Sequence, residues 1–447
     1  MFFWSAKLVA ESRHMTTLLY WFRQDLRLAD NAAFLAACNE ASALIPVYCH
    51  DPAVDAQTAW GFARVAGHRR AWLAATLADL RSQLRARGSD LVEITGAPAQ
   101  VLPELAQRLG AAAVYCEMIA APEERADVAA IAAAGVKVVV RWQSSLLEPA
   151  EMPFAVERTP DVFTAFRSAV EKVSVVPHMP VPAPSQVPPL PVSDLPLSNL
   201  PDRHLPDAAG QPAPDARSSF PYFEAQFSGG ETAAAAHVQA YFDKGLAQTY
   251  KLTRNGLIGT DYSSKFSPWL ATGALSPRLA YAALKACEER SGANDSTYWL
   301  WFELLWREHF RFLHLKYGKK LYRGRGLQDA PAPTHNARGF VRWYEGRTGQ
   351  PFIDAGMHEL AATGYLSNRM RQNVASYLIH DLGGDWRAGA AWFESQLLDY
   401  DVYSNQGNWL YLAGRGTDPR GTRRFDPVKQ ARDYDPQGHY RDLWRNP

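Results

Sequence analysis

One predicted helix, residues 296–315, combines aromatic rings with a carboxylate at positions i, i+4, i+7 and i+11, which form a single helical face. These four residues are Trp299, Glu303, Trp306 and Phe310. A carboxylate within an aromatic stripe is costly to bury without a partner, and Arg307, four residues after Glu303, could supply one. Two interpretations remain open: a core helix with one salt bridge, or a cavity wall that stacks a flat ligand and hydrogen-bonds it through Glu303.

A second segment, residues 262–278, gathers hydroxyl groups around one lysine. Ser263, Ser264 and Ser267 flank Lys265, and Pro268 is placed to open a helix. Free backbone N–H groups and hydroxyls at a helix start can hold a phosphate, so the segment is a candidate phosphate cradle. An ordinary capped helix explains the same residues equally well.

Acidic and amide side chains follow a predicted helix near residue 398. Asp399, Asp401 and Asn405 lie in the stretch DYDVYSNQGNW. Such a group could bind a metal, ligand hydroxyls or an upstream arginine such as Arg371, and a solvated loop is the alternative.

Basic residues concentrate in two places although the formal net charge is only +1. No acid interrupts the first cluster, between residues 309 and 328, whereas Asp418 and Asp426 accompany the second. Interleaved aromatic residues suit phosphate and stacking contacts, although solvated basic faces are common. The basic residues are Arg311, Lys316, Lys319, Lys320, Arg323 and Arg325, and then Arg415, Arg420, Arg423, Arg424, Lys429 and Arg432.

The chain that must position these groups has 447 residues, of which 47% are hydrophobic and 21% charged, as expected for a folded protein of two or three domains. Its four cysteines are widely spaced, which argues against a disulfide framework or a cysteine metal site and favours a reducing cytoplasm. We predict neither a membrane span nor a metal site. Residues 1–14 are expected to be an extension, with Met15 as a possible natural start.

Strand-like and helical patterns alternate through residues 15–150, which predicts a doubly wound α/β domain with a five-stranded parallel sheet. The expected strands are 18–22, 43–48, 91–94, 113–116 and 136–140, and the expected helices are 62–87, 99–109 and 123–133. No GxGxxG or GKS/GKT sequence follows the first strand, so neither a dinucleotide fold of the Rossmann type nor a P-loop is supported.

Twelve prolines between residues 177 and 214 predict an extended, proline-rich linker within the segment 151–220. From 221 to 447 we expect an all-helical domain. Its predicted helices are 231–242, 278–290, 296–315, 368–382 and 387–398.

Five long motifs follow one another along the chain: LYWFRQDLRLADN (19–31), GTDYSSKFSPWLATGALSPR (259–278), ELLWREHFR (303–311), SNRMRQNVASYLIHDL (367–382) and DYDVYSNQGNW (399–409). In this order they resemble the photolyase/cryptochrome family over nearly the whole chain. The DASH-type cryptochromes are most similar, through YKLTRNGLIGTDYSSKFSPW and DYDVYSNQGNWLYLAG.

The resemblance implies an N-terminal antenna domain and a helical domain that binds FAD. Carried over by position, Arg371 would pair with Asp399 and Asp401, and Asn405 would face the flavin N5 atom. The complete implied set of cofactor-binding residues is Tyr250, Ser263, Ser264, Lys265, Phe266, Ser267, Glu303, Arg307, Asn368, Arg371, Asp399, Asp401 and Asn405.

The same resemblance implies blue-light-driven electron transfer from reduced FAD to a cyclobutane pyrimidine dimer in DNA. Glu303 and Trp306 would line the substrate cavity, while Trp409 and Trp386 would carry electrons that reduce FAD. Asn368 and Asn405 complete the candidate catalytic set. The candidate DNA contacts are Arg307, Arg369, Gln372, Tyr411 and Arg423.

Four positions depart from patterns in the family. Gln372 and Tyr411 replace a methionine and a tryptophan of classical dimer photolyases, which favours single-stranded substrate. Pro333 stands at the outermost tryptophan of the electron chain. Ile119 occupies the position of a glutamate that binds a methenyltetrahydrofolate antenna, so this folate, another antenna or none all remain open. We expect a monomeric lyase; the alternative is a blue-light receptor or DNA-binding regulator without repair activity.

Overall fold

The computed structural model describes residues 16–192 and 212–446. The predicted extension at residues 1–14 lies outside these ranges, as do the prolines at 196, 201 and 206.

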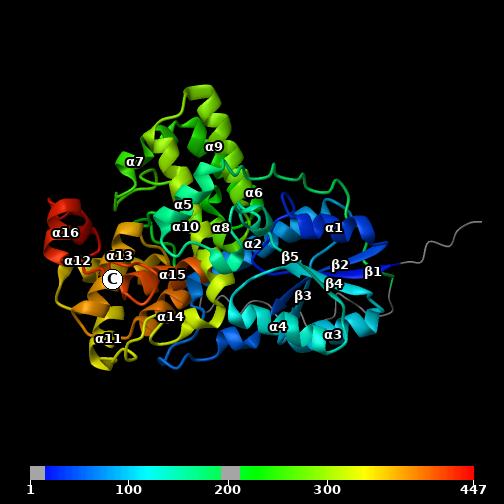
Figure 1. The fold of residues 1–447 in the computed structure, drawn as a ribbon, viewed down its shortest axis with the longest axis horizontal. Coiled ribbons are helices and arrows are strands. Elements are labelled where there is room, and N and C mark those ends of the chain that lie inside the picture. The colour runs from blue at the N-terminus through cyan, green and yellow to red at the C-terminus, as the bar shows by residue number, and fades with distance from the viewer. Residues whose placement is uncertain (1–15, 193–211, 447) are drawn as a thin grey trace, which may run out of the picture.

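The N-terminal part is a five-stranded parallel sheet, as predicted, and its strand order is β3-β2-β1-β4-β5. In Figure 1, α1 lies on one face of this sheet and α3 and α4 lie on the other. The elements are β1 (Thr17–Phe22), α1 (Ala32–Glu40), β2 (Ala43–His50), α2 (Gly67–Arg85), β3 (Val92–Thr95), α3 (Pro98–Leu109), β4 (Ala113–Glu117), α4 (Pro122–Ala133) and β5 (Val138–Arg141).

The central strand β1 explains why the sheet is covered on both faces. Residues 18–22 are buried without the polar alternation of a half-exposed strand. Leu18 and Tyr20 pack with residues of α1 and α2, whereas Leu19 and Trp21 pack with residues of α3 and α4. Register is set by parallel pairing, for example Leu19 with Ile45.

One helix within the predicted linker was not predicted. Helix α5 (Phe163–Lys172) buries Phe163, Phe166 and Val170 in a cluster that includes Leu305 and Phe312 of α10. The described residues 173–192, which include the first prolines of the run, contain no helix or strand.

The C-terminal part is helical, as predicted, but it contains more helices than the sequence patterns indicated. Its elements are α6 (Glu231–Asp243), α7 (Tyr250–Thr253), α8 (Ser267–Thr272), α9 (Pro277–Ser291), α10 (Asp295–Tyr317), α11 (Ala337–Tyr344), α12 (Pro351–Thr363), α13 (Asn368–His380), α14 (Trp386–Gln396), α15 (Val402–Leu412), α16 (Pro427–Tyr434) and α17 (His439–Leu443). No helix within the described ranges has the length and apolarity needed to cross a membrane.

Helix α10, with 23 residues, is the longest of the helices given above, and a capping box fixes its N-terminus. The Asn294 side chain accepts from the backbone N–H of Thr297, and the Thr297 hydroxyl accepts from the backbone N–H of Asn294. The helix contacts both α7 and α15. It therefore carries its side chains between the elements that surround the candidate site.

Buried charges join the two parts of the chain. Asp30 receives Arg278 Nε at 2.9 Å and the backbone N–H of Val181 at 3.1 Å, and it also accepts from the Ser276 hydroxyl. Gly273, in the left-handed region at φ 73°, allows close approach, because a Cβ there would lie 1.9 Å from the Gln24 carbonyl oxygen. The α/β part and the helical part are thus locked together at this contact.

Candidate functional site

A cavity of about 470 Å³ lies within the helical part, in the volume range of small-molecule sites. Side chains of α7, α8, α10, α13 and α15 line it, together with the segments before α8 and α15. All thirteen predicted cofactor-binding residues line this one cavity, as do Trp306, Gln372, Trp409 and Tyr411. The predicted residues Trp386, Arg369 and Arg423 do not line it.

The aromatic face of α10 forms part of the cavity wall. Trp299, Glu303, Trp306 and Phe310 all line it, so of the two interpretations left open by their spacing, the cavity wall is the one that the structure shows. The Trp306 ring is held by Phe163 of α5, with ring centroids 3.8 Å apart and planes 12° from parallel. The unpredicted helix α5 thus fixes a predicted site residue.

The partner predicted for Glu303 was wrong. Arg254 Nη1 lies 2.5 Å from Glu303 Oε1. Arg307 instead donates to the Ser144 carbonyl oxygen at 2.8 Å and lies 3.5 Å from Glu308 Oε1. Burial raises the pKa of the Glu303 carboxyl, and the Arg254 charge opposes that rise.

Lys265 is buried at the cavity wall in a left-handed backbone conformation, with φ 57°. Its Nζ lies 3.3 Å from the centre of the Tyr262 ring, a cation–π geometry, and makes no hydrogen bond. Desolvation holds the pKa of this amine well below its ordinary value. An anionic ligand group would supply the missing acceptor.

Arg371 and Asp399 form the predicted ion pair, with Nη2 2.8 Å from Oδ2. The other carboxylate oxygen of Asp399, Oδ1, is buried without a hydrogen-bond partner. Asp401 does not join the pair: it caps α15 by accepting from the Ser404 backbone N–H at 2.7 Å, which corrects the prediction for this residue. Asn405 donates to the Ala390 carbonyl oxygen at 3.0 Å.

These features fit FAD. A lysine nitrogen and a carboxylate oxygen, both buried, lack partners at the wall of a cavity that also offers aromatic faces and serine hydroxyls. FAD has a diphosphate, a polyhydroxylated chain and two flat ring systems, which match these groups in kind. Among the residues that the structure describes, no three His, Cys, Asp or Glu side chains are placed to hold a metal ion.

Glu359 on α12 was missed by sequence analysis. It is fully enclosed, accepts from Ser219 Oγ at 3.1 Å and from the Tyr440 hydroxyl, and feels the charge of Lys265. Burial raises the pKa of its carboxyl to about 7. Because these partners are distant in sequence, no local pattern pointed to it.

The predicted electron-carrying tryptophans differ in position. Trp409 is buried and lines the cavity, and its ring centre lies 6.4 Å from that of Trp343. Trp386 is buried away from the cavity wall and donates to the Gly324 carbonyl oxygen at 3.0 Å.

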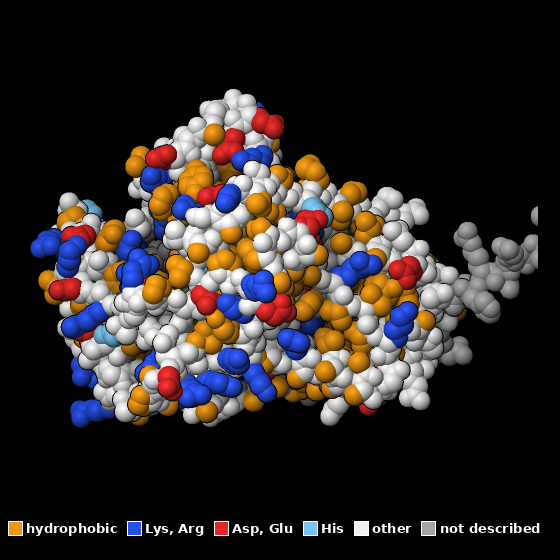
Figure 2. Space-filling model, viewed as in Figure 1, with side chains coloured by type: hydrophobic (Ala, Val, Ile, Leu, Met, Phe, Trp, Pro, Cys, Tyr) orange, Lys and Arg blue, Asp and Glu red, His pale blue; other side chains and the backbone are white. Residues whose placement is uncertain are grey.

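The predicted DNA-contacting arginines are partly engaged within the chain. Arg369 donates to Gln372 at 2.8 Å and to Asn255 at 2.9 Å. Arg423 lies 3.1 Å from Asp418, which also pairs with Arg420. Lys and Arg side chains are nevertheless frequent over the helical half of the surface in Figure 2.

Ile119, at the position of the antenna glutamate, is buried in an apolar cluster. It shares that cluster with Phe310, Leu313 and Tyr403. The Tyr403 hydroxyl accepts from the backbone N–H of Ala120 at 2.6 Å.

Family models and known proteins match most of the chain. Family models match residues 18–187 (DNA photolyase) and 299–445 (FAD binding domain of DNA photolyase). A cryptochrome DASH from Gloeobacter violaceus is 44% identical over 96% of this chain and 85% of its own length, and one from Xenopus laevis is 44% identical over 94% and 81%.

Solved structures give the same result. A cryptochrome from Synechocystis superposes with a TM-score of 0.88, at 42% identity over 96% of this chain and 88% of that one. A class III photolyase from Agrobacterium tumefaciens gives 0.79, at 29% identity over 98% and 88%. With its FAD-binding domain and its close similarity to these relatives, the chain belongs to the photolyase/cryptochrome family and is a flavoprotein of the DASH type.

Proposed function

We propose that the protein uses blue light to split cyclobutane pyrimidine dimers, preferentially in single-stranded DNA. The observation that carries this proposal is a single cavity in which Glu303 and Trp306 face the same space as Lys265 and the Arg371–Asp399 pair. In this proposal the groups around Lys265 and the Arg371–Asp399 pair hold the flavin cofactor, and Glu303 and Trp306 take the pyrimidine substrate.

The chain's own residues would hold FAD by complementary charge and hydrogen bonding. Lys265 and the serines around it face the diphosphate in this proposal, while Asn368, Arg371 and Asp399 surround the flavin and its polyol chain. The Asn405 amide can donate or accept as the protonation of its neighbour requires. When bound and reduced, FAD would supply light absorption and one electron, which the dimer holds while it splits and which then returns to the cofactor.

Glu303 and Trp306 would bind the dimer. Trp306 offers an aromatic surface that Phe163 keeps in place, and the Glu303 carboxylate accepts hydrogen bonds from pyrimidine N–H groups while Arg254 holds its position. A dimer in a duplex must be flipped out before it reaches such a cavity, at the cost of its stacking. The polar Gln372 and the smaller ring of Tyr411 offset that cost poorly, which favours single strands.

Trp409, at the cavity wall, is the proposed first donor when FAD needs reduction, with Trp386 next along the route. Pro333 cannot act as an electron donor at the surface end. Photoreduction is therefore proposed to be slow, whereas repair by FAD that is already reduced does not depend on this route.

The test uses the purified, reduced protein and a single-stranded oligonucleotide with one thymine dimer. Blue light should restore the thymine absorbance, and a dark sample should show no gain. Glu303→Gln should lower the rate at least tenfold with FAD content unchanged, because a neutral amide is a weaker acceptor for the pyrimidine N–H groups. Glu289→Gln, an exposed change on α9, is the matched control.

Loss of FAD in Glu303→Gln equal to the loss of repair would make the residue structural. No light-dependent gain by the unaltered protein would contradict the proposed reaction, and dark DNA binding without repair would favour the receptor alternative. The absorption spectrum of the same sample tests for an antenna: a strong near-ultraviolet band beyond those of FAD would show a folate despite Ile119.

A further inference from the structure

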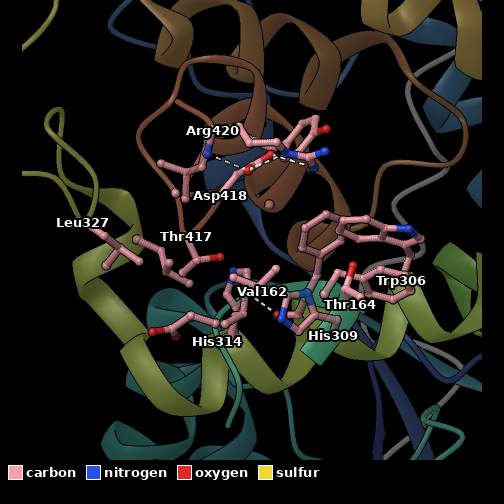
Figure 3. A pocket seen from close by; sticks show the side chains of 18 residues that line it. Val162, Thr164, Trp306, His309, His314, Leu327, Thr417, Asp418 and Arg420 are labelled. Carbon is pink, nitrogen blue, oxygen red and sulfur yellow. Dashed lines mark hydrogen bonds and ion pairs between the residues drawn. The ribbon is translucent and has the colours of Figure 1, made fainter. Parts of the chain in front are cut away.

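A second, smaller cavity of about 70 Å³ adjoins the site and has no role in the reaction described above. Figure 3 shows it between α10, the start of α5 and the loop that follows α15. We call it the side pocket. Trp306, His309 and His314 reach it from α10, Thr164 from α5, and Thr417 from the loop.

The side pocket shares a wall with the main cavity. Trp306, Phe310 and Tyr411 line both spaces, and the rings of Trp306 and Tyr411 lie 6.3 Å apart between centroids. A group bound in the side pocket is therefore a direct neighbour of a substrate held against Trp306. Its volume exceeds the 10–15 Å³ or so that a single water needs, so it has room for a group larger than one water.

His309 gives this pocket a specific polar requirement. The side chain is 2% exposed, and its Nε2 lies 3.0 Å from the Pro160 carbonyl oxygen. A carbonyl oxygen can only accept, so Nε2 carries the proton and Nδ1 has a lone pair. Nδ1 is buried and has no hydrogen-bond partner. Desolvation lowers the pKa of His309 to about 4, which keeps the ring neutral at physiological pH.

His314, in the same pocket, shows the contrast. It is also buried, but its Nδ1 lies 2.8 Å from the Phe310 carbonyl oxygen and its Nε2 lies 3.1 Å from the Tyr322 hydroxyl. Both of its nitrogens are thus engaged within the chain. The unused acceptor of His309 is a feature of that residue and not of the pocket's histidines in general.

The rim of the pocket suits a nucleic-acid backbone. Two carboxylates, Asp161 and Asp418, and the guanidinium of Arg420 line it. Arg423 also pairs with Asp418 and Lys316 pairs with Asp161, so the two carboxylates are matched by three cations. Arg420 is exposed, so it can reach a phosphate. The Thr417 hydroxyl adds a further hydrogen-bonding group.

We propose that the side pocket takes the base adjacent to the dimer in the same strand, with the base's ring N–H donating to His309 Nδ1. This inference rests on the proposed function for the identity of its ligand. A thymine fits the requirement because its N3–H is a donor on the ring edge. The pocket would thereby favour dimers that lie within runs of thymine.

The test is a double-mutant cycle that combines one change in the protein with one change in a base. The measured quantity is the affinity of the FAD-loaded protein for single-stranded oligonucleotides in the dark. The probes carry one thymine dimer, with thymine or N3-methylthymine as the next base on the 5′ or the 3′ side. Methylation on one of the two sides should weaken binding roughly fivefold, as expected for one lost neutral hydrogen bond. His309→Phe should weaken binding of the unmethylated probe similarly and become insensitive to methylation.

Two further variants protect the test against misfolding of His309→Phe. His309→Gln keeps a donor for Pro160 and an acceptor for the base, so it should retain sensitivity to methylation. Thr417→Trp should block the pocket mouth and abolish that sensitivity while His309 stays intact. FAD content, measured for each variant, reports whether the fold is preserved.

The inference is overturned if methylation has no effect on either side, or if its effect is the same with and without the His309 imidazole. Failure of the proposed function looks different: oligonucleotides with and without the dimer would bind equally. In that case coupling between His309 and the methyl group would still show a base-binding pocket.

Discussion

Two buried arginine–aspartate pairs have nearly the same length but different surroundings. Arg278 and Asp30 lie 2.9 Å apart where the α/β and helical parts meet, and Asp30 also accepts from Ser276 and Val181. Arg371 and Asp399 lie 2.8 Å apart at the cavity wall, and Asp399 Oδ1 has no partner. We call the first the closed pair, because groups of the protein donate to both oxygens of its carboxylate. We call the second the open pair, because one oxygen of its carboxylate has no partner.

The difference separates a structural charge from one that is ready for a ligand. A buried carboxylate is retained at low cost only when its lone pairs are occupied, so the closed pair serves the fold. An open pair beside a cavity, next to a second unpartnered group at Lys265, has hydrogen-bonding capacity in reserve for a ligand. Three measurements test this distinction.

The largest expected effect is on the closed pair. Asp30→Asn should lower the free energy of unfolding by about 3 kcal/mol, because the buried Arg278 charge loses its nearer carboxylate and keeps only Glu148, 3.4 Å away. Asparagine tolerates the left-handed backbone at this position, so the change isolates the charge. Urea unfolding measures the loss, and Asp261→Asn, an exposed pair member 3.8 Å from Lys244, is the control. A loss as small as that of the control would mean that the closed pair does not hold the domains together.

The second effect concerns Glu359, behind the open pair. Burial raises the pKa of its carboxyl from 4.5 to about 7, so between these values the folded protein keeps a proton that the unfolded chain has released. Its contribution to stability is therefore full below about pH 4.5 and is lost as the pH rises towards 7.

Glu359→Gln removes this titration. Urea unfolding at a series of pH values measures the difference in stability between the unaltered protein and the variant. This difference should change between about pH 4.5 and 7 and level off above that range. A difference that stays constant from pH 4.5 to 7 would contradict the raised pKa.

The smallest expected effect is on the open pair. Asp399→Asn should weaken retention of FAD by about tenfold, equivalent to about 1.4 kcal/mol, while the stability of the FAD-free protein falls by less than in Asp30→Asn. Arg371 is 22% exposed at the cavity wall, and solvent screens it when its partner is neutralised. Fluorescence of FAD released on dialysis reports retention. If Asp399→Asn destabilised the FAD-free protein as much as Asp30→Asn, the two pairs would not differ in role.

The sheet was predictable because its strands are short and apolar throughout, as in β1, where residues 18–22 are all buried. Helix α5 was not predicted, because the proline-rich sequence that follows it led us to interpret the whole segment 151–220 as a linker. Its buried residues, Phe163, Phe166 and Val170, do fall at the helical spacing i, i+3 and i+7, and they pack in the cluster that contains Leu305 and Phe312 of α10. Helices α11 and α12 were missed in a stretch that carries no motif.

The site was predictable as a set of residues but not as a set of contacts. The helical spacing of α10 placed Glu303 and Trp306 on a common face, and the motifs placed the FAD residues around them. The i+4 rule then suggested Arg307 as the partner of Glu303, whereas Arg254 is 49 positions away and was hidden within the motif YKLTRNG. Tertiary packing decided between the two arginines, and one sequence alone does not reveal it.

The closed pair also sets the order of events during synthesis. Asp30 and Arg278 are separated by 248 positions, so the sheet is complete long before its buried carboxylate meets a counterion. At about 5–20 residues per second the ribosome needs roughly 12–50 s to supply Arg278. During that interval Asp30 must remain hydrated, which keeps the docking face of the α/β part open until the helical part arrives. The closed pair thus forms late in assembly, after most of the chain has been made.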